Sequence, residues 1–314
     1  MARPVVQGEV TRRRWIWWPS LALIAACAAP PRWQEDLNVA LREARREGRE
    51  VVVFFALPGR ELSDRMEARI DHPVIMDAIG RGGFAAVRCD GVVRKRLYSA
   101  WIGGGEGMGV AVLDRQGAVY CARPGPQDPE QLAALLDLCA ARRADLAALR
   151  QRQSAAPEDP LLQHDLGCLY LQLGCRVHSE PLLLEAATAG VVDARHRLAR
   201  LYALDGNVAA ARRWLASAPR TPAAMATEGY VLFKERRHRD ATTVFYEALA
   251  TGKLGDERQR AVLYLGKALH ENEQDDEAVP VLEALVEERT GSTFEAAALH
   301  TLGHIYNPGH SHAH

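Results

Sequence analysis

The sequence predicts an α/β domain followed by an all-α array of helical repeats, with a short signal segment in front of both. Three observations lead to this fold class. A basic cluster and an apolar run open the chain, and helical periodicity then alternates with β-rich runs up to residue 150. From residue 158 the pattern is helical throughout, and one short string recurs in it. The 314 residues suffice for two domains.

The first 27 residues have the pattern of an export signal. Three arginines at positions 12–14 precede an apolar run, residues 15–26, which Pro19 and Ser20 interrupt and which is too short for an ordinary spanning helix. The run ends in Leu-Ile-Ala-Ala-Cys, which resembles the lipobox of bacterial lipoproteins. The resemblance implies that residues 1–27 are a lipoprotein signal peptide and that Cys27 carries a lipid anchor. It places the mature chain in the bacterial cell envelope, facing the periplasm.

Two alternatives remain for this segment. Cys27 could follow an ordinary signal, or a short N-terminal anchor, by chance. The arginines also loosely resemble a twin-arginine signal, so the export route stays open.

Charge and cysteine content limit the function further. The chain has 39 basic and 40 acidic residues, so composition gives no reason to expect a nucleic-acid partner. If Cys27 is lipidated, an odd number of cysteines remains in an oxidising compartment, and at least one is unpaired or pairs between chains. These are Cys89, Cys121, Cys139, Cys168 and Cys175, and none of them forms a Cys-x-x-Cys motif.

Residues 33–150 contain the elements of the α/β domain in order. An amphipathic helix ends at Gly48, and a buried-type strand follows at residues 51–55. After the loop FFALPGRELSDRME come a second helical stretch and a strand at residues 84–90. Residues 114–117 form a turn between two further strands, with Gly117 supplying positive φ. A helix is expected over residues 129–150, with a linker at residues 151–154.

This order, together with Trp33, the run AL-x-EA-x-x-EG-x-E into VVVFF, Met66-Glu67 and the LDRQG turn, resembles exported bacterial thioredoxin-like domains. In that family a Trp-Cys-x-x-Cys loop follows the first core strand. Counting back from Met66-Glu67, the two cysteine positions fall on Arg60 and Ser63. The family's cis-proline position falls near Met108, so two parts of the redox site are absent. The resemblance therefore implies a redox-inactive domain.

Thiol–disulfide exchange needs an attacking thiolate and a second thiol, which Arg60 and Ser63 cannot supply. We therefore expect no enzyme activity. The alternative is an oxidoreductase that uses a non-standard cysteine pair. Cys168 and Cys175 would lie about 10 Å apart on a straight helix, too far to bridge, unless Gly174 ends that helix. No cofactor is expected, because the glycine-rich residues 103–107 lack the Gly-Lys-Ser/Thr of a phosphate loop.

Residues 158–306 repeat a short pattern: DLGCLY, RLARLY, EGYVLF, YLGKAL and TLGHIY. Its small residues follow one another at intervals of 32, 30, 37 and 37 residues, at Gly167, Ala199, Gly229, Gly266 and Gly303. A small residue lets two helices approach closely, and a large one on the next helix, such as Phe245 or Leu282, fills the gap. The pattern resembles degenerate tetratricopeptide repeats (TPR), which implies a concave surface for a protein or peptide partner. An irregular helical bundle is the alternative.

Histidines are concentrated at the C-terminus. His300 and His304 are four residues apart and therefore share a helix face, which suits two imidazoles on one metal ion. Residues 307–314 form a His-rich tail with His310, His312 and His314, and imidazole suits zinc or copper. A disordered tail, natural or left from expression, and a partner-contacting helix pair are the alternatives. The remaining histidines, His164, His178, His196, His238 and His270, occur singly and are interpreted as surface or inter-helix residues.

Taken together, the patterns favour an exported, membrane-anchored protein-interaction module. Its redox-dead thioredoxin-like domain and its helical repeats would bind a protein or peptide partner. A thiol–disulfide oxidoreductase and a zinc- or copper-binding protein acting through the C-terminal histidines are the competing hypotheses.

Overall fold

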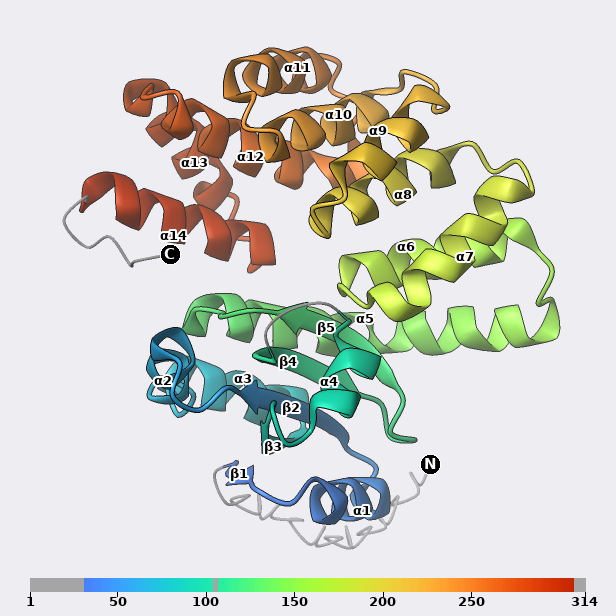
Figure 1. The fold of residues 1–314 in the computed structure, drawn as a ribbon, viewed down its shortest axis with the longest axis vertical. Coiled ribbons are helices and arrows are strands. Elements are labelled where there is room, and N and C mark those ends of the chain that lie inside the picture. The colour runs from blue at the N-terminus through green and yellow to red at the C-terminus, as the bar shows by residue number, and fades with distance from the viewer. Residues whose placement is uncertain (1–30, 104–106, 308–314) are drawn as a thin grey trace, which may run out of the picture. The chain divides into compact units, whose positions relative to one another are not determined.

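The computed structural model describes residues 31–103 and 107–307. From Pro31 on, these residues belong to one compact unit. Figure 1 shows an α/β portion followed by a helical portion, which confirms the predicted fold class at this level. The signal segment with Cys27, and the tail histidines His310, His312 and His314, lie outside the described residues.

A five-stranded sheet forms the centre of the α/β portion, with the order β1-β3-β2-β4-β5. The strands are β1 (Trp33–Gln34), β2 (Glu50–Ala56), β3 (Phe84–Asp90), β4 (Gly109–Leu113) and β5 (Val119–Pro124). The pairs β1–β3 and β2–β3 are parallel, whereas β4 is antiparallel to β2 and β5 is antiparallel to β4. All seven residues of the central strand β2 are buried. Residues 51–56 are apolar, as expected for a strand that is covered on both faces, and the buried Glu50 pairs with Arg143 at 2.9 Å.

Helices α1 (Leu37–Glu47), α2 (Glu61–Glu67), α3 (Pro73–Gly82), α4 (Lys95–Trp101) and α5 (Pro129–Ala155) complete this portion. The Asp36 carboxylate caps α1 by accepting hydrogen bonds from two backbone N–H groups, and Gly48 ends the helix with φ 67°. The Asp114 carboxylate holds the predicted hairpin turn by accepting hydrogen bonds from the N–H groups of Gln116 and Ala118.

The linker expected at residues 151–154 was wrong, because α5 runs through it to Ala155. Its residues are Gln, Arg, Gln and Ser, of which the first three are good helix formers. The helix stops only at Ala156, which precedes Pro157, a position where proline disfavours helical backbone. The long α5 therefore reaches from the sheet to the first helix of the helical portion.

The helical portion begins with the hairpins α6 (Pro160–Gln172) with α7 (Arg176–Thr188) and α8 (Asp193–Leu204) with α9 (Val208–Ala216). It continues with α10 (Pro222–Lys234) and α11 (His238–Ala250), the short 3-10 helix η1 (Gly255–Glu257), α12 (Arg258–Glu271), α13 (Asp275–Glu287) and α14 (Thr293–Tyr306). Consecutive helices pack as antiparallel pairs, and the first helices of successive pairs also contact one another, as in α8–α10, α10–α12 and α12–α14.

Three of the five recurring small residues lie where the helices of a pair cross. A Cβ atom on Gly167 would lie 2.9 Å from Leu183 Cγ, and one on Gly229 would lie 2.8 Å from the Phe245 ring. On Gly266 it would lie 2.5 Å from the Leu282 side chain. Gly303 differs, because nothing within 4 Å would meet its Cβ, and no further helix follows α14 among the described residues. The close packing of the two helices therefore requires glycine in these three pairs, whereas Gly303 in the last helix is not required for packing.

The hydrophobic core around the sheet extends into the start of the helical portion, whereas the later helices have clusters of their own. The cluster around the sheet extends to Leu166, Leu169 and Tyr170 of α6. Arg123 of β5 donates a hydrogen bond to the Gln172 carbonyl at 2.9 Å, and Arg150 of α5 donates one to the Tyr170 hydroxyl of α6 at 2.8 Å. At the other end of the array, α14 also packs against α5.

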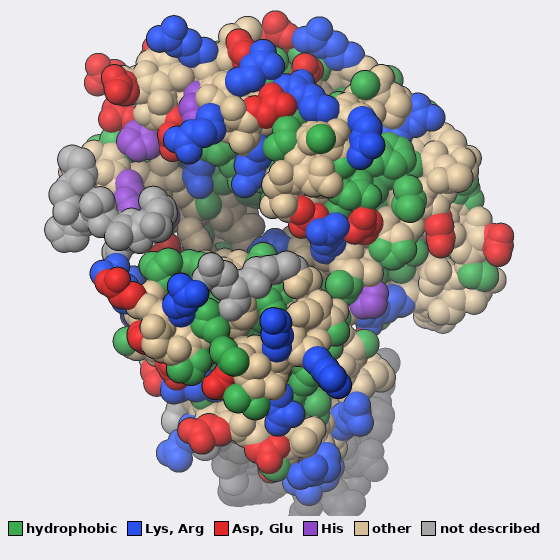
Figure 2. Space-filling model, in the orientation of Figure 1, with side chains coloured by type: hydrophobic (Ala, Val, Ile, Leu, Met, Phe, Trp, Pro, Cys, Tyr) green, Lys and Arg blue, Asp and Glu red, His purple; other side chains and the backbone are tan. Residues whose placement is uncertain are grey.

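No helix among residues 31–103 and 107–307 is long and apolar enough to span a bilayer. Figure 2 shows acidic and basic side chains interspersed over the visible face, as the near-balanced charge of the sequence suggests.

Two glycine substitutions test the packing role of the small residues. Gly266→Ala should lower the free energy of unfolding, because overpacking costs about 1–3 kcal/mol, while the helix propensity gained is only about 1 kcal/mol. Gly303→Ala should leave stability unchanged or raise it by up to about 1 kcal/mol, because its Cβ meets no neighbour. Urea unfolding of both variants measures the difference, and equal midpoints would contradict the packing argument.

Candidate functional site

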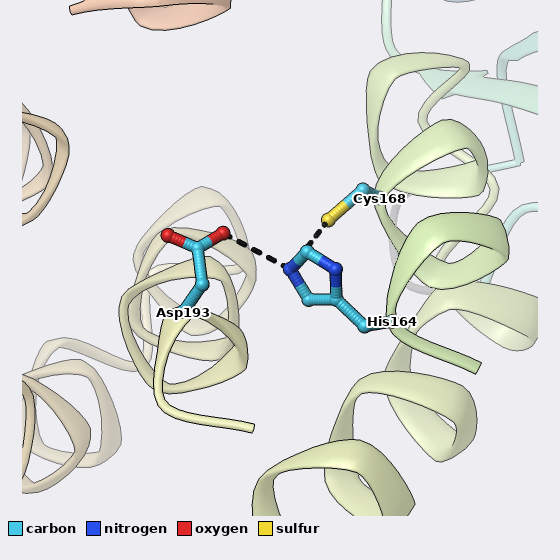
Figure 3. A group of neighbouring side chains, drawn as sticks. All are labelled: His164, Cys168 and Asp193. Carbon is cyan, nitrogen blue, oxygen red and sulfur yellow. Dashed lines mark hydrogen bonds and ion pairs between the residues drawn. The ribbon is translucent and has the colours of Figure 1, made fainter. Parts of the chain in front are cut away.

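Among the residues that the structure describes, one group of three side chains could hold a metal ion: His164, Cys168 and Asp193. Their ligand atoms all lie within 4.8 Å of one another. Figure 3 shows the His164 ring between the Cys168 thiol, one turn along α6, and the Asp193 carboxylate of α8. The i,i+4 spacing puts His164 and Cys168 on one helix face, and the packing of α6 beside α8 brings Asp193 to them.

Both ring nitrogens of His164 have partners. Nε2 lies 3.0 Å from Asp193 Oδ2 and 3.4 Å from Cys168 Sγ, and Nδ1 lies 3.1 Å from Asp165 Oδ1. Hydrogen bonding to Asp193, and then to Cys168, raises the pKa of His164 to about 10. In a nucleophilic triad the nucleophile and the orienting carboxylate occupy different ring nitrogens. Here the thiol and Asp193 both face Nε2, so the group is not arranged as such a triad.

Asp193 is held by further contacts from its own helix. Its Oδ1 lies 3.3 Å from His196 Nδ1, and its Oδ2 lies 3.3 Å from Arg197 Nε. Burial opposes ionisation, but the hydrogen bond from His164 and the charges of His196 and Arg197 lower the pKa of Asp193 well below its usual range. Burial lowers the pKa of His196 to about 4, and its Nε2 has no hydrogen-bond partner. The Asp193 side chain is 44% exposed, so the cluster opens to solvent on this side.

Arg197 connects the cluster to a buried ionic network. It pairs with Asp256, with Nη1–Oδ2 at 3.1 Å, and with Glu257. Glu257 is fully buried and also pairs with Arg200, at 3.0 Å, and with Arg260. Burial opposes ionisation, but Arg260, Arg200 and Arg197 lower the pKa of Glu257 to about 2. One carboxylate at the start of α12 thereby fixes the orientation of α8, including the face that carries Asp193.

The positions that replace the redox cysteines have structural roles. Arg60 is the exposed N-cap residue of α2, and Ser63 is fully buried in the first turn of that helix. The Ser63 hydroxyl accepts a hydrogen bond from the Leu57 N–H at 2.7 Å, which fixes the loop after β2. Met108, at the position near which the family has its cis-proline, is buried and directly precedes β4.

The cysteines of the described residues are all free, and only Cys168 is not buried. Burial raises the pKa of Cys89 to about 11 and that of Cys175 to about 12. Gly174 ends the α6 turn with φ 73°, as the sequence suggested it could. Cys175 nevertheless lies against the carbonyl of Val119 at the sheet edge, whereas Cys168 faces His164. This geometry gives no support to a redox pair of these two cysteines.

The two described C-terminal histidines lie on one face of α14, with their Nε2 atoms 3.2 Å apart. His300 Nε2 also lies 3.0 Å from Asp128 Oδ2, at the start of α5. His300 and Asp128 border a groove of about 380 Å³ between α14 and the α5 N-terminus. Binding of zinc or copper by this pair and the three tail histidines stays a prediction.

The sequence interpretation missed the His164 cluster. It treated His164 and His196 as isolated and considered Cys168 only as a partner for Cys175. The i,i+4 spacing of His164 and Cys168 was the available signal, but Asp193 belongs to the next repeat and joins them only through helix packing.

A comparison with known protein families and with curated proteins finds no match to this chain.

Replacing Glu257 tests the ionic network. Glu257→Gln should lower the free energy of unfolding at neutral pH by about 3–5 kcal/mol, because it leaves buried guanidinium groups without their carboxylate. Glu247→Gln is the control, since its pair with Arg220 is exposed and should contribute no more than about 1 kcal/mol.

The same carboxylate gives an acid dependence. Its pKa is about 2 in the folded chain and 4.5 ordinarily, so its stabilisation is complete above about pH 4.5 and is lost as the pH falls toward 2. Denaturant unfolding at a series of pH values between these two should show that the difference in unfolding free energy between wild type and Glu257→Gln becomes smaller as the pH falls. A gap that stays constant would rule out this assignment.

Proposed function

We propose that this chain is an exported, membrane-anchored protein-interaction module. A thioredoxin-like portion without redox cysteines is joined to a tetratricopeptide-like array, which binds a protein or peptide partner. A lipid on Cys27 anchors the chain in the bacterial cell envelope with its folded body facing the periplasm. The anchor and location rest on the sequence pattern of residues 1–27.

The sheet supports the thioredoxin-like part of the proposal. Its order places β2 in the centre, with parallel β3 on one side and the antiparallel β4–β5 hairpin on the other. The loop after β2 leads into α2, where the family carries its cysteines, and here Arg60 and Ser63 stand in their places. A portion of this kind keeps the scaffold and lacks the chemistry, so we assign it a binding or positioning role.

The helix pairs support the repeat-array part. Glycine at the crossing of three pairs, opposite Leu183, Phe245 and Leu282, matches the small and large positions of the sequence repeat. Contacts between the first helices of successive pairs align these helices along one side of the array, as in repeat proteins that bind extended partners.

An open pocket of about 540 Å³ on α8 and α9 carries the partner-binding part of the proposal. Its lining includes Tyr202, Arg213 and Trp214. Tyrosine, arginine and tryptophan are the residue types most enriched among interface hot spots. Arg213 is exposed and Trp214 is half-buried, so the pocket offers a cation beside an aromatic wall. A partner that places an apolar or acidic side chain there would fit this chemistry.

Restoring the two cysteines tests the thioredoxin-like assignment. Arg60→Cys with Ser63→Cys should form a disulfide, and its dithiol form, regenerated by added dithiothreitol, should reduce insulin. The first cysteine would sit at the N-terminus of α2, where the helix dipole favours a thiolate. Wild type and the single variant Arg60→Cys should show no turnover. A double variant that folds but never forms the disulfide would contradict the assignment, and wild-type turnover that depends on a native cysteine would favour the oxidoreductase.

Photo-crosslinking in the producing bacterium tests partner binding. A photoreactive residue at Trp214 should capture a discrete protein in the membrane fraction, whereas one at the exposed Glu47 of α1 should not. Arg213→Ala should weaken the capture at position 214. Cys27→Ser should leave an unprocessed precursor without acyl groups, which mass spectrometry detects. Equal capture at both positions would mean that the pocket is not the binding surface.

A further inference from the structure

We infer that His164, Cys168 and Asp193 form a zinc site with three protein ligands and an open fourth position. The proposed interaction module makes no use of this cluster, so the inference stands independently of partner binding. It also concerns a different part of the chain from the C-terminal histidines.

The distances between the three donor atoms suit a tetrahedral ion. Zinc bonds of about 2.0–2.1 Å to nitrogen, 2.0–2.2 Å to oxygen and 2.3 Å to sulfur give tetrahedral edges of roughly 3.4–3.6 Å. The observed edges are 3.0 Å from His164 Nε2 to Asp193 Oδ2 and 3.4 Å from His164 Nε2 to Cys168 Sγ. The third edge is no longer than 4.8 Å, so small side-chain rotations complete the geometry.

The surroundings orient the ligands as in known zinc sites. A ligating histidine usually gives its second ring N–H to a carboxylate, and Asp165 Oδ1 takes that place at His164 Nδ1. His196 fixes Asp193 at Oδ1, the oxygen away from His164, whereas Arg197 Nε lies 3.3 Å from Oδ2, the oxygen that faces His164. Arg197 also forms ion pairs with Asp256 and Glu257. These carboxylates neutralise part of its positive charge and so reduce its repulsion of a bound cation.

The donor set favours zinc over magnesium and calcium. One imidazole, one thiolate and one carboxylate combine nitrogen, sulfur and oxygen, all of which zinc accepts. Magnesium and calcium prefer oxygen alone. Zinc would displace the protons of His164 and Cys168, and the resulting thiolate and the carboxylate would together balance the 2+ charge of the ion. Because the Asp193 side chain is 44% exposed, the fourth position faces solvent and would hold water or a ligand from outside.

Cobalt(II) titration of the purified full chain tests the site, since cobalt reports a sulfur ligand through a charge-transfer band in the near ultraviolet. One equivalent of cobalt(II) should produce this band together with the d–d absorption of a tetrahedral site. Added zinc should displace the cobalt and remove both signals. Cys168→Ser should abolish the band. Asp165→Asn should keep the band and lower zinc affinity by about 10- to 100-fold, as expected for a residue that positions a ligand.

The matched control is the double variant His300→Ala with His304→Ala, which removes an i,i+4 pair of histidines beside a carboxylate elsewhere in the chain. It should leave the sulfur band intact. If this variant loses the band, or if the band survives Cys168→Ser, the site lies elsewhere and the inference is wrong. Absence of the band in the wild type would mean that the three groups are joined only by hydrogen bonds.

A measurement on the wild type guards against a Cys168→Ser variant that fails to fold. Cys168 is the one cysteine of the described residues that is not buried, so it should react first with maleimide. One equivalent of zinc should slow its alkylation at least tenfold, as followed by peptide mass spectrometry, and a chelator should restore the rate. Alkylation of Cys168 at the same rate with and without zinc would overturn the inference.

Discussion

The buried carboxylate of Glu257 is the interaction on which the arrangement of the helical portion depends. It is fully buried at the end of η1 and faces arginines from α8 and α12. Arg260 also donates a hydrogen bond to the Thr227 hydroxyl of α10 at 3.2 Å, so the network joins three helices that are the first members of their pairs. Charges in such a place are costly unless each is matched, and this requirement admits only a narrow range of helix positions. Apolar contacts alone would allow the helices to shift further relative to one another.

The proposed zinc cluster depends on this network. Asp193 is the first residue of α8, and Arg197 and Arg200 follow one and two turns later on the same helix. The arginines fix the rotation of α8 about its axis, and the same rotation presents Asp193 to α6. Arg197 contacts Asp193 and Glu257 directly, so a single side chain connects the exposed end of the network with its buried end. The cluster is therefore built on two rigid helices, which is the arrangement that holds ligand geometry best.

How far the sequence could predict the molecule depended on whether the signal was local. The strand at residues 84–90, the turn held by Gly117 and the glycine cap at Gly48 all follow from residues that are close in sequence. The continuation of α5 beyond Arg150 was missed because a polar run reads equally well as a linker or as an exposed helix. Two of the three residues of the His164 cluster, His164 and Cys168, form an i,i+4 pair that the sequence shows. Asp193 and Glu257 could not be assigned to it, because their proximity is created by packing between repeats, and a lone acidic residue carries no mark of its neighbours.

The contact of α14 with α5 has a mechanical consequence. An open array of repeats behaves as a spring, because its pitch can change a little at every joint. Here α6 and α14, at opposite ends of the array, both pack against the 27-residue helix α5, so the array is held at both ends. Its pitch cannot change without releasing one end. The α6 end is secured by a shared hydrophobic core, whereas the α14 end includes the polar contact between His300 and Asp128. If the array opens, the α14 end is therefore the end expected to separate from α5 first.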